Sequence, residues 1–308
     1  MRARTIGVAL TTAFLLTLSG VALATAFPTG PWSQAVRVED LPGTDPSFNT
    51  PSLDGCPFIS RDGKTFYMAS DRSGGLGGID IWVSTRASTS DAWGPPVNVG
   101  EPVNSSSNDF CPTIDRDGHR FFFVSNRPGG CGGDDIYVTR LRDTGFDPVT
   151  NIGCDTDGGA NSAANEASPF PLPESGDGPV LYFSSTRSGA GDIYRARHEG
   201  AGFGLAELVD GVNTEAVEGQ PNVRRDGLEI FFFSTRSGGL GAQDIYSATR
   251  ASTADAWSTP VNLGSNINSA AGETRPSLSW DGTTLYFGST RTGGTAEGSS
   301  DIYVTTRG

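Results

Sequence analysis

Apolar side chains recur along this chain in five short runs that are hydrophobic on both faces. The runs are rich in Phe, Tyr and Leu, and they span Thr65–Ser70, Arg120–Ser125, Val180–Ser185, Glu229–Ser234 and Thr284–Ser289. A strand can be apolar on both faces only where other layers cover both sides of its sheet. The pattern therefore predicts five strands, each in a sheet that packs between two neighbouring sheets.

Turn residues bracket each of these runs in the same way. An Asp-Gly pair precedes each run, at Asp62-Gly63, Asp117-Gly118, Asp177-Gly178, Asp226-Gly227 and Asp281-Gly282. Glycine supplies the positive φ of a tight hairpin, so an earlier strand precedes each pair. Each earlier strand carries a proline, at Pro57, Pro112, Pro169, Pro221 and Pro276. Proline suits an edge strand, such as one that faces a central channel.

Further strands complete a repeating unit of 52 to 57 residues. After a Gly-rich loop, a third strand begins at Asp80, Asp135, Asp192, Asp244 and Asp301. An aromatic residue followed by alternating apolar residues marks a fourth strand at Trp93–Val99, Phe146–Ile152, Phe203–Leu208 and Trp257–Leu263. The fifth copy of this pattern lies at the other end of the chain, at Trp32–Val38. We therefore predict an all-β fold, a five-bladed β-propeller of four-stranded blades, closed by the N-terminal strand completing the last blade.

The repeated phrase resembles a known family. Pro-x-x-Ser-x-Asp-Gly, an aromatic strand, Ser-x-Arg, Gly-Gly-x-Gly and Asp-Ile-Tyr are similar to the WD40-like β-propeller repeat of TolB-type bacterial proteins, over about residues 32–308. The resemblance implies an exported propeller that serves as a scaffold or binding module in the cell envelope. The chain lacks the separate N-terminal α/β domain and the six blades of TolB itself, so membership of the Tol system does not follow.

The N-terminal composition and the net charge predict where the protein resides and which partners it does not bind. Arg2 and Arg4 precede an apolar run from Ile6 to Leu23 and the small-x-small sequence Ala24-Thr25-Ala26, which predicts a signal peptide over residues 1–26. Residues 27–308 then form a single domain, exported to the periplasm or the medium. The formal net charge of −13 disfavours binding to nucleic acid. We also expect no membrane insertion and a monomer.

A repeated set of charges is the main candidate site. An acid lies three residues before each leading proline, at Asp54, Asp109, Glu166, Glu218 and Glu273. An arginine follows each aromatic strand, at Arg72, Arg127, Arg187, Arg236 and Arg291. The topology brings both sets to one face. Because Arg pairs bidentately with carboxylates, a structural network is one interpretation, and a ring that binds a ligand is the other.

Two functions follow from these alternatives. The first is a non-catalytic module that binds an envelope or extracellular protein, peptide or glycan, with no catalytic residue. The second is a five-bladed propeller glycoside hydrolase that uses central carboxylates as acid and base. Hydrolysis needs two carboxyl groups in different environments, whereas here the surroundings repeat in every unit. No Gly-x-Ser-x-Gly elbow and no Gly-x4-Gly-Lys-Ser/Thr loop occurs.

No cofactor or metal is predicted. The aspartates that begin the third strands follow Gly-rich loops, where they either cap loop amides or bind calcium. Most of these loops offer only one or two acids, and calcium prefers six to eight oxygen ligands, so capping is the favoured interpretation. The two histidines, His119 and His198, have no zinc-type spacing and are expected at the surface.

The cysteines break the fivefold symmetry. Cys56 and Cys111 occupy equivalent positions before Pro57 and Pro112, whereas Cys131 lies in a Gly-rich loop and Cys154 follows a fourth strand. Four cysteines in an exported chain allow three pairings, of which we favour Cys56–Cys111 and Cys131–Cys154. The stretch from Cys154 to Ser168 is longer than its counterparts. It is a second place where ligand specificity could reside.

Overall fold

The computed structural model describes residues 27–174, 178–200, 202–292 and 299–308. The predicted signal peptide, residues 1–26, lies outside this described part. Almost all regular structure is strand, and the described helices are two three-residue 3-10 turns, Val38–Asp40 and Asp155–Asp157. No helix in the described ranges has the length and apolar character needed to cross a membrane.

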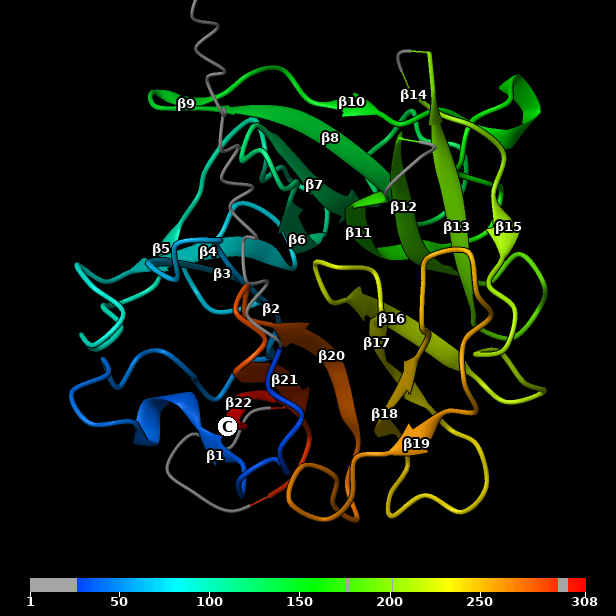
Figure 1. The fold of residues 1–308 in the computed structure, drawn as a ribbon. Coiled ribbons are helices and arrows are strands. Elements are labelled where there is room, and N and C mark those ends of the chain that lie inside the picture. Colours follow the sequence, from blue (N-terminus) through cyan, green and yellow to red (C-terminus); the bar gives the residue numbers. More distant parts are fainter. Residues whose placement is uncertain (1–26, 175–177, 201, 293–298) are drawn as a thin grey trace, which may run out of the picture.

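The strands form five antiparallel sheets arranged around a central axis, as Figure 1 shows. From the axis outward, the first blade contains β2 (Asp54–Ile59), β3 (Thr65–Ser70), β4 (Asp80–Thr85) and β5 (Val97–Asn98). The second blade contains β6 (Asp109–Ile114), β7 (Arg120–Ser125), β8 (Asp135–Arg142) and β10 (Thr150–Asn151). The third blade contains β11 (Glu166–Glu174), β12 (Gly178–Ser185), β13 (Asp192–Glu199) and β15 (Glu207–Leu208). The fourth blade contains β16 (Glu218–Val223), β17 (Glu229–Ser234), β18 (Asp244–Thr249) and β19 (Val261–Asn262). The short β9 (Gly145–Phe146) and β14 (Gly202–Phe203) extend β8 and β13 as hairpins.

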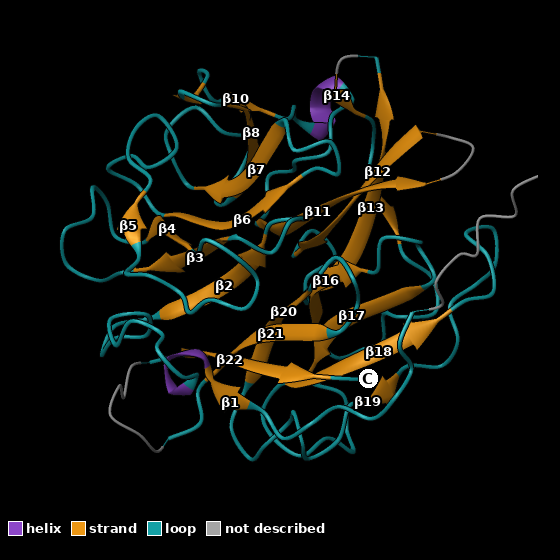
Figure 2. Cartoon of the chain, turned by 60° about the vertical axis from the view of Figure 1, so that its left-hand side comes forward, coloured by secondary structure: helices purple, strands orange, loops and turns teal. Residues whose placement is uncertain are grey.

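The N-terminal strand completes the fifth blade, as predicted. This blade contains β20 (Glu273–Leu278), β21 (Thr284–Ser289), β22 (Asp301–Thr306) and, outermost, β1 (Val36–Arg37). Strand β1 pairs antiparallel with β22, with Val36 opposite Val304 and Arg37 opposite Tyr303, and the two lie side by side in Figures 1 and 2. The innermost strands contact one another in a closed ring, because β2 contacts both β6 and β20.

The hydrophobic core is divided among the five interfaces between blades. Alternate residues of each second strand face opposite neighbours: Phe66 and Met68 of β3 pack against the last blade, and Tyr67 packs against the second. The same division gives a separate buried cluster at each of the other three interfaces. This arrangement explains why the second strands are apolar on both faces.

The predicted hairpins form with one change. Gly63, Gly118, Gly227 and Gly282 have positive φ, as the Asp-Gly turns require. Gly178 instead begins strand β12, where it pairs with Glu174, and Asp177 lies outside the described residues. The predicted fourth strands are too long, since the outermost strand of each blade has only two residues. Trp93 and Trp257 pack beneath Arg86 and Arg250 at 4.2 Å instead of pairing, whereas Phe146 and Phe203 pair in the short strands β9 and β14.

A β-bulge interrupts every innermost strand at the residue before its proline. The register shifts there in all five sheets. The bulged residues are Cys56, Cys111, Ser168, Gln220 and Arg275, all with φ between 46° and 57°. A non-glycine residue before proline rarely adopts this conformation. The bulges direct five side chains, of four residue types, toward the axis on a repeated backbone.

Three of the aspartates that begin the third strands cap amides of their own loops. Asp80 accepts hydrogen bonds from the amides of Leu76 and Gly77. Asp135 and Asp244 bind their own loops in the same way. A Cβ at Gly75 would lie 2.1 Å from Asp80 Oδ2, so only glycine fits there. Asp192 instead accepts from the Ser188 hydroxyl, and residues 293–298 of the last loop are outside the described part.

Both favoured disulfides are present. Cys56–Cys111 joins the innermost strands of the first and second blades, and Cys131–Cys154 ties a loop of the second blade to the segment that leads to the third. The described residues contain no free cysteine. Disulfides of this kind persist in oxidising compartments.

Replacing Cys131 and Cys154 together with serine should lower the free energy of unfolding by about 3 kcal/mol, because the bond closes a loop with a sequence separation of 23 residues. Urea denaturation of the oxidised parent and the variant measures this difference. Equal stabilities would show that the bond does not constrain the unfolded chain. The Ser88 hydroxyl bonds only Ser90, so Ser88→Ala is a control that should leave stability close to that of the parent.

Candidate functional site

The repeated acids and arginines form five ion pairs, each inside one blade. The distances from the arginine Nη2 to the carboxylate oxygen lie between 2.5 and 3.2 Å. All five acids are fully buried. Each guanidinium also lies over the ring that follows Asp-Ile in its third strand, with distances of 4.5 to 5.3 Å to Trp82, Tyr137, Tyr194, Tyr246 and Tyr303.

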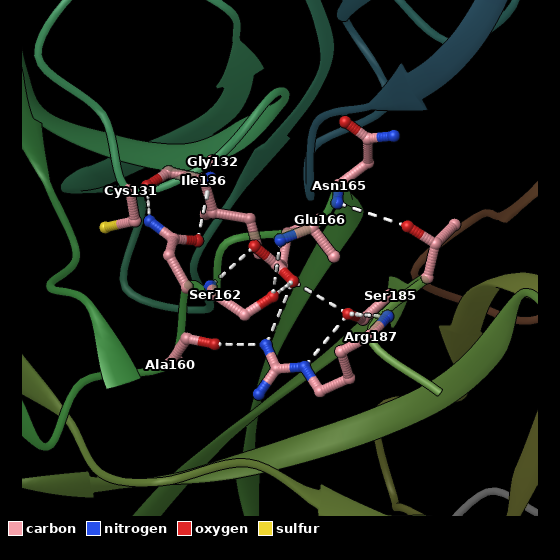
Figure 3. A network of polar contacts seen from close by, with 12 residues as sticks. Cys131, Gly132, Ile136, Ala160, Ser162, Asn165, Glu166, Ser185 and Arg187 are labelled. Atoms are coloured by element: carbon pink, nitrogen blue, oxygen red, sulfur yellow. Dashed lines mark hydrogen bonds and ion pairs between the residues drawn. The ribbon is translucent and has the colours of Figure 1, made fainter. Parts of the chain in front are cut away.

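Figure 3 shows the third of these pairs with its surroundings. Glu166 accepts hydrogen bonds from the amide and hydroxyl of Ser162, from the Ser185 hydroxyl and from Arg187. Arg187 also donates to the carbonyl of Ala160 at 2.6 Å. The carboxylate and its arginine thus bind the segment that arrives from the preceding blade.

An asparagine five residues before each acid holds the other end of this connection, and sequence reasoning missed it. Asn104 accepts from the Ile81 amide at 2.8 Å and donates to the Ile81 carbonyl at 2.9 Å, both on the third strand of the preceding blade. Asn49, Asn161, Asn213 and Asn268 repeat this contact. The recurrence of Asn-Ser/Thr before every acid was a signal that could have revealed the clamp.

These contacts support the structural interpretation of the repeated charges. Every carboxylate is engaged by its own blade and by the incoming segment, so it joins neighbouring blades. At Asp54, burial raises the pKa of the carboxyl, against the opposing charge of Arg72. Ligand binding by these ten residues stays a prediction. The stretch from Cys154 to Ser168 supplies the clamp residues Asn161 and Ser162, and its role in specificity is likewise untested.

A large cavity lies at the opposite face, where the Asp-Gly hairpins of the first and second strands converge on the axis. Its volume is about 620 Å³, within the range of ligand pockets. Apolar residues of the innermost strands form its inner part, including Phe58 and Phe170, which also line the narrow neck further along the axis. Hairpin residues form its mouth. We call this cavity the axial funnel.

Three arginines surround one tryptophan at the mouth of the axial funnel. The guanidinium groups of Arg61, Arg225 and Arg116 lie 4.9, 5.5 and 5.9 Å from the ring centroid of Trp280. These residues come from four different blades, at the residue just before the Asp-Gly turn. Across the described ranges none of the three guanidinium groups forms an ion pair with a carboxylate. The mouth is therefore a cationic and aromatic patch on an acidic protein.

Three carboxylates also line the axial funnel, those of Asp62, Asp115 and Asp117, and the first two have partners in their own hairpins. Asp62 accepts from the Ser60 hydroxyl at 2.6 Å, and this hydrogen bond lowers the pKa of its carboxyl. Asp115 pairs with Arg120 at 2.8 Å. A general acid requires the opposite shift, a raised pKa.

Metal chemistry finds no support among the side chains that the structure places. No group of three or more His, Cys, Asp or Glu residues there could hold an ion. His119 is exposed at its hairpin. His198, expected at the surface, is half-buried, with its ring edge-on to Phe203 at 5.5 Å.

Solved structures resemble this chain in fold. TolB from Acinetobacter baumannii superposes with a TM-score of 0.50 and 16% identity, over 84% of this chain and 55% of the TolB chain. An alpha-L-arabinofuranosidase from Lactobacillus brevis gives 0.57 and 14%, over 88% and 94%. An endo-arabinase from Bacteroides thetaiotaomicron gives 0.54 and 18%, over 84% and 97%. No protein-family model and no curated protein sequence matches the chain.

At these identities the likeness shows the fold, a propeller of the kind found in TolB, and nothing finer. The chain spans little more than half of the TolB chain that it matches. The same fold serves a Tol protein and glycosidases, so function must be argued from the site itself.

Proposed function

We propose that this chain is an exported, non-catalytic binding module of the WD40-like TolB type that captures an acidic peptide or glycan at the axial funnel. The observation that carries the proposal is the group of three unpaired arginines around Trp280. Guanidinium groups bind carboxylates in a planar, bidentate manner, and the half-buried Trp280 offers aromatic surface to a sugar ring or an apolar side chain.

Charge supports an anionic ligand. The whole chain carries a formal net charge of −13, so an unpaired cationic cluster stands out against its surroundings. A field of this kind concentrates anions at one place and repels them elsewhere. The two disulfides support export.

Rigidity supports binding rather than a conformational change at the site. The arginines and the tryptophan stand on tight turns between strands whose other ends are held by the buried ion pairs and asparagine clamps. A site built on such a frame loses little conformational entropy when a ligand binds. The different residues at equivalent turns give specificity without disturbing the repeated core.

Glycoside hydrolysis is the alternative function. It would use two carboxyl groups near the axis, one of them with a raised pKa. The five innermost acids are each paired with an arginine, and Asp62 at the funnel has a lowered pKa. The likeness to arabinofuranosidases is one of fold alone, so the binding module is the better-supported function.

Substitutions at the funnel should weaken binding of acidic polymers without affecting the fold. The probes are polygalacturonate and poly-glutamate, each with an uncharged counterpart, and the measurement is isothermal titration calorimetry at two salt concentrations. Arg61→Gln and Arg225→Gln should each weaken binding about 10-fold, because each removes a charged hydrogen-bond donor. Trp280→Ala should also weaken it. Binding of poly-glutamate indicates a peptide ligand, and binding of polygalacturonate indicates a glycan ligand.

Arg142→Gln is the matched control. Arg142 is exposed and pairs with Asp147 at the outer end of the second blade, so its loss should leave affinity unchanged. If no acidic polymer binds to the folded parent, or if the uncharged polymers bind equally well, the proposed function is wrong.

A further inference from the structure

A second cavity lies at the other end of the axis, beyond the neck. Its volume is about 240 Å³. The neck of about 40 Å³ is lined by the five bulged residues and their prolines, and it separates this cavity from the axial funnel. The apolar Leu53, Ala69, Ile79 and Phe110 line the second cavity together with polar and charged residues, among them Asn108. We call it the acid-face cavity, because it lies on the face where the buried acids begin their strands.

One cation lines the acid-face cavity. Arg275 occupies the bulge of the fifth blade, where the other four blades carry the uncharged residues Cys56, Cys111, Ser168 and Gln220. Its guanidinium lies against Gly55, since a Cβ at that glycine would be 2.9 Å from Nη1. Its Nε is buried and makes no hydrogen bond, and within the described ranges the group has no ion-pair partner. Burial lowers the pKa of Arg275, consistent with a cation that lacks a counter-charge.

One anion lines the same cavity. Asp134 precedes the third strand of the second blade, and the equivalent residues of the other blades are the uncharged Ile79, Gly191, Gln243 and Ser300. Its backbone bonds to Asn165 and Glu166, whereas its half-buried carboxylate pairs with no cation among the residues described. Burial and the charges of Asp135 and Glu166 raise the pKa of this carboxyl.

The two charges therefore break the fivefold symmetry in one cavity without neutralising each other. No nitrogen of Arg275 lies within 4.0 Å of an Asp134 oxygen, since the two form no salt bridge. Unpaired charges in a partly desolvated place are costly unless a partner with complementary charges joins them. A ligand that carries both a carboxylate and an ammonium group meets this requirement.

We propose that the acid-face cavity binds a small zwitterion of the amino-acid class. The ligand carboxylate pairs with the Arg275 guanidinium and its ammonium group with the Asp134 carboxylate. The other lining residues, which include Leu53, Phe110 and Asn108, are uncharged and favour a neutral remainder. The site is independent of the axial funnel, which binds acidic polymers at the opposite face.

Calorimetric titration of the folded mature chain tests the proposal. The zwitterions are L-leucine, L-alanine, β-alanine and γ-aminobutyrate, which vary in side chain and in the separation of their charges. Propionate and ethylammonium carry one charge each. We expect saturable binding of at least one zwitterion and about 10-fold weaker or no binding of the single-charge probes. Arg275→Gln and Asp134→Asn should each weaken zwitterion binding about 10-fold.

Controls separate this site from the rest of the protein. Arg140→Gln and Asp143→Asn remove exposed charges on the second blade and should leave binding unchanged, as should Arg61→Gln at the axial funnel. If Arg275→Gln does not fold, Asp134→Asn, at a half-buried position, decides the outcome. The proposal is overturned if no zwitterion binds, if propionate binds as tightly as the zwitterions, or if Asp134→Asn binds like the parent. Because the funnel variants are measured separately, either site can fail alone.

Discussion

Deleting residues 27–41 should abolish the cooperative unfolding transition of the propeller. The deletion removes Trp32, Ala35 and Val38, whose buried side chains fill the two interfaces that flank the fifth blade. Loss of one buried Trp and one buried Val alone costs about 5 kcal/mol. Native domains have a total stability of about 5 to 15 kcal/mol, so little would remain.

The deletion also opens the ring. Strand β22 loses its pairing with β1, and Thr306 loses the hydrogen bond that its carbonyl accepts from the Ser33 amide at 2.8 Å. Arg307 lies over Trp32 at 4.5 Å and pairs with the buried Glu229 of the fourth blade. Without Trp32, the Arg307 guanidinium loses this contact with an aromatic ring. A long unpaired edge promotes association between chains.

Circular dichroism during heating, together with gel filtration, measures the result. We expect the shortened protein to lose its transition or to aggregate. Val36→Asn in the full chain is the control, because Val36 pairs through its backbone and is 42% exposed, so its transition should remain close to that of the parent. A shortened protein that melts like the full chain would show that the closure contributes nothing.

The closure, the blade count and the Cys56–Cys111 bond could be predicted because each depends on positions that repeat in the sequence. Trp32 aligns with Trp257 because both pack beneath an arginine that ends a third strand, Arg307 and Arg250. Hairpin glycines and strand-initiating aspartates are likewise fixed by backbone geometry, which acts locally. Local constraints of this kind can be seen in one sequence.

The axial sites could not be predicted because their residues meet only after the ring closes. Arg61, Arg116, Arg225 and Trp280 stand at equivalent turns of four blades, so their convergence depends on how far the axis is open at that face. Arg275 and Asp134 come from the fifth and second blades. Sequence reasoning singled out the symmetric charges, whereas the unpaired charges are those that break the symmetry.

Glu218→Gln should destabilise the protein strongly while leaving the axial funnel intact. The substitution keeps the shape of the side chain but leaves the charge of Arg236, 3.2 Å away, without its counter-ion. Glu218 is fully buried, and breaking a buried pair in this way costs about 3 to 5 kcal/mol. It also weakens the bonds from the amide and hydroxyl of Thr214, which hold the connection to the third blade. Urea denaturation measures the loss.

The matched control is Asp147→Asn, which breaks the exposed pair with Arg142 and should leave stability close to that of the parent, since solvent screens such pairs. If Glu218→Gln retains full stability, the buried pair is not structural. If the parent hydrolyses a glycan and the Glu218→Gln variant does not, the acid is catalytic and the proposed binding-module function is wrong. The structural interpretation requires the reverse: a lower urea midpoint, with the affinity of the funnel for acidic polymers unchanged under conditions where both proteins are folded. That combination follows from the geometry, because Glu218 lies at the opposite end of the innermost strand from the arginines around Trp280.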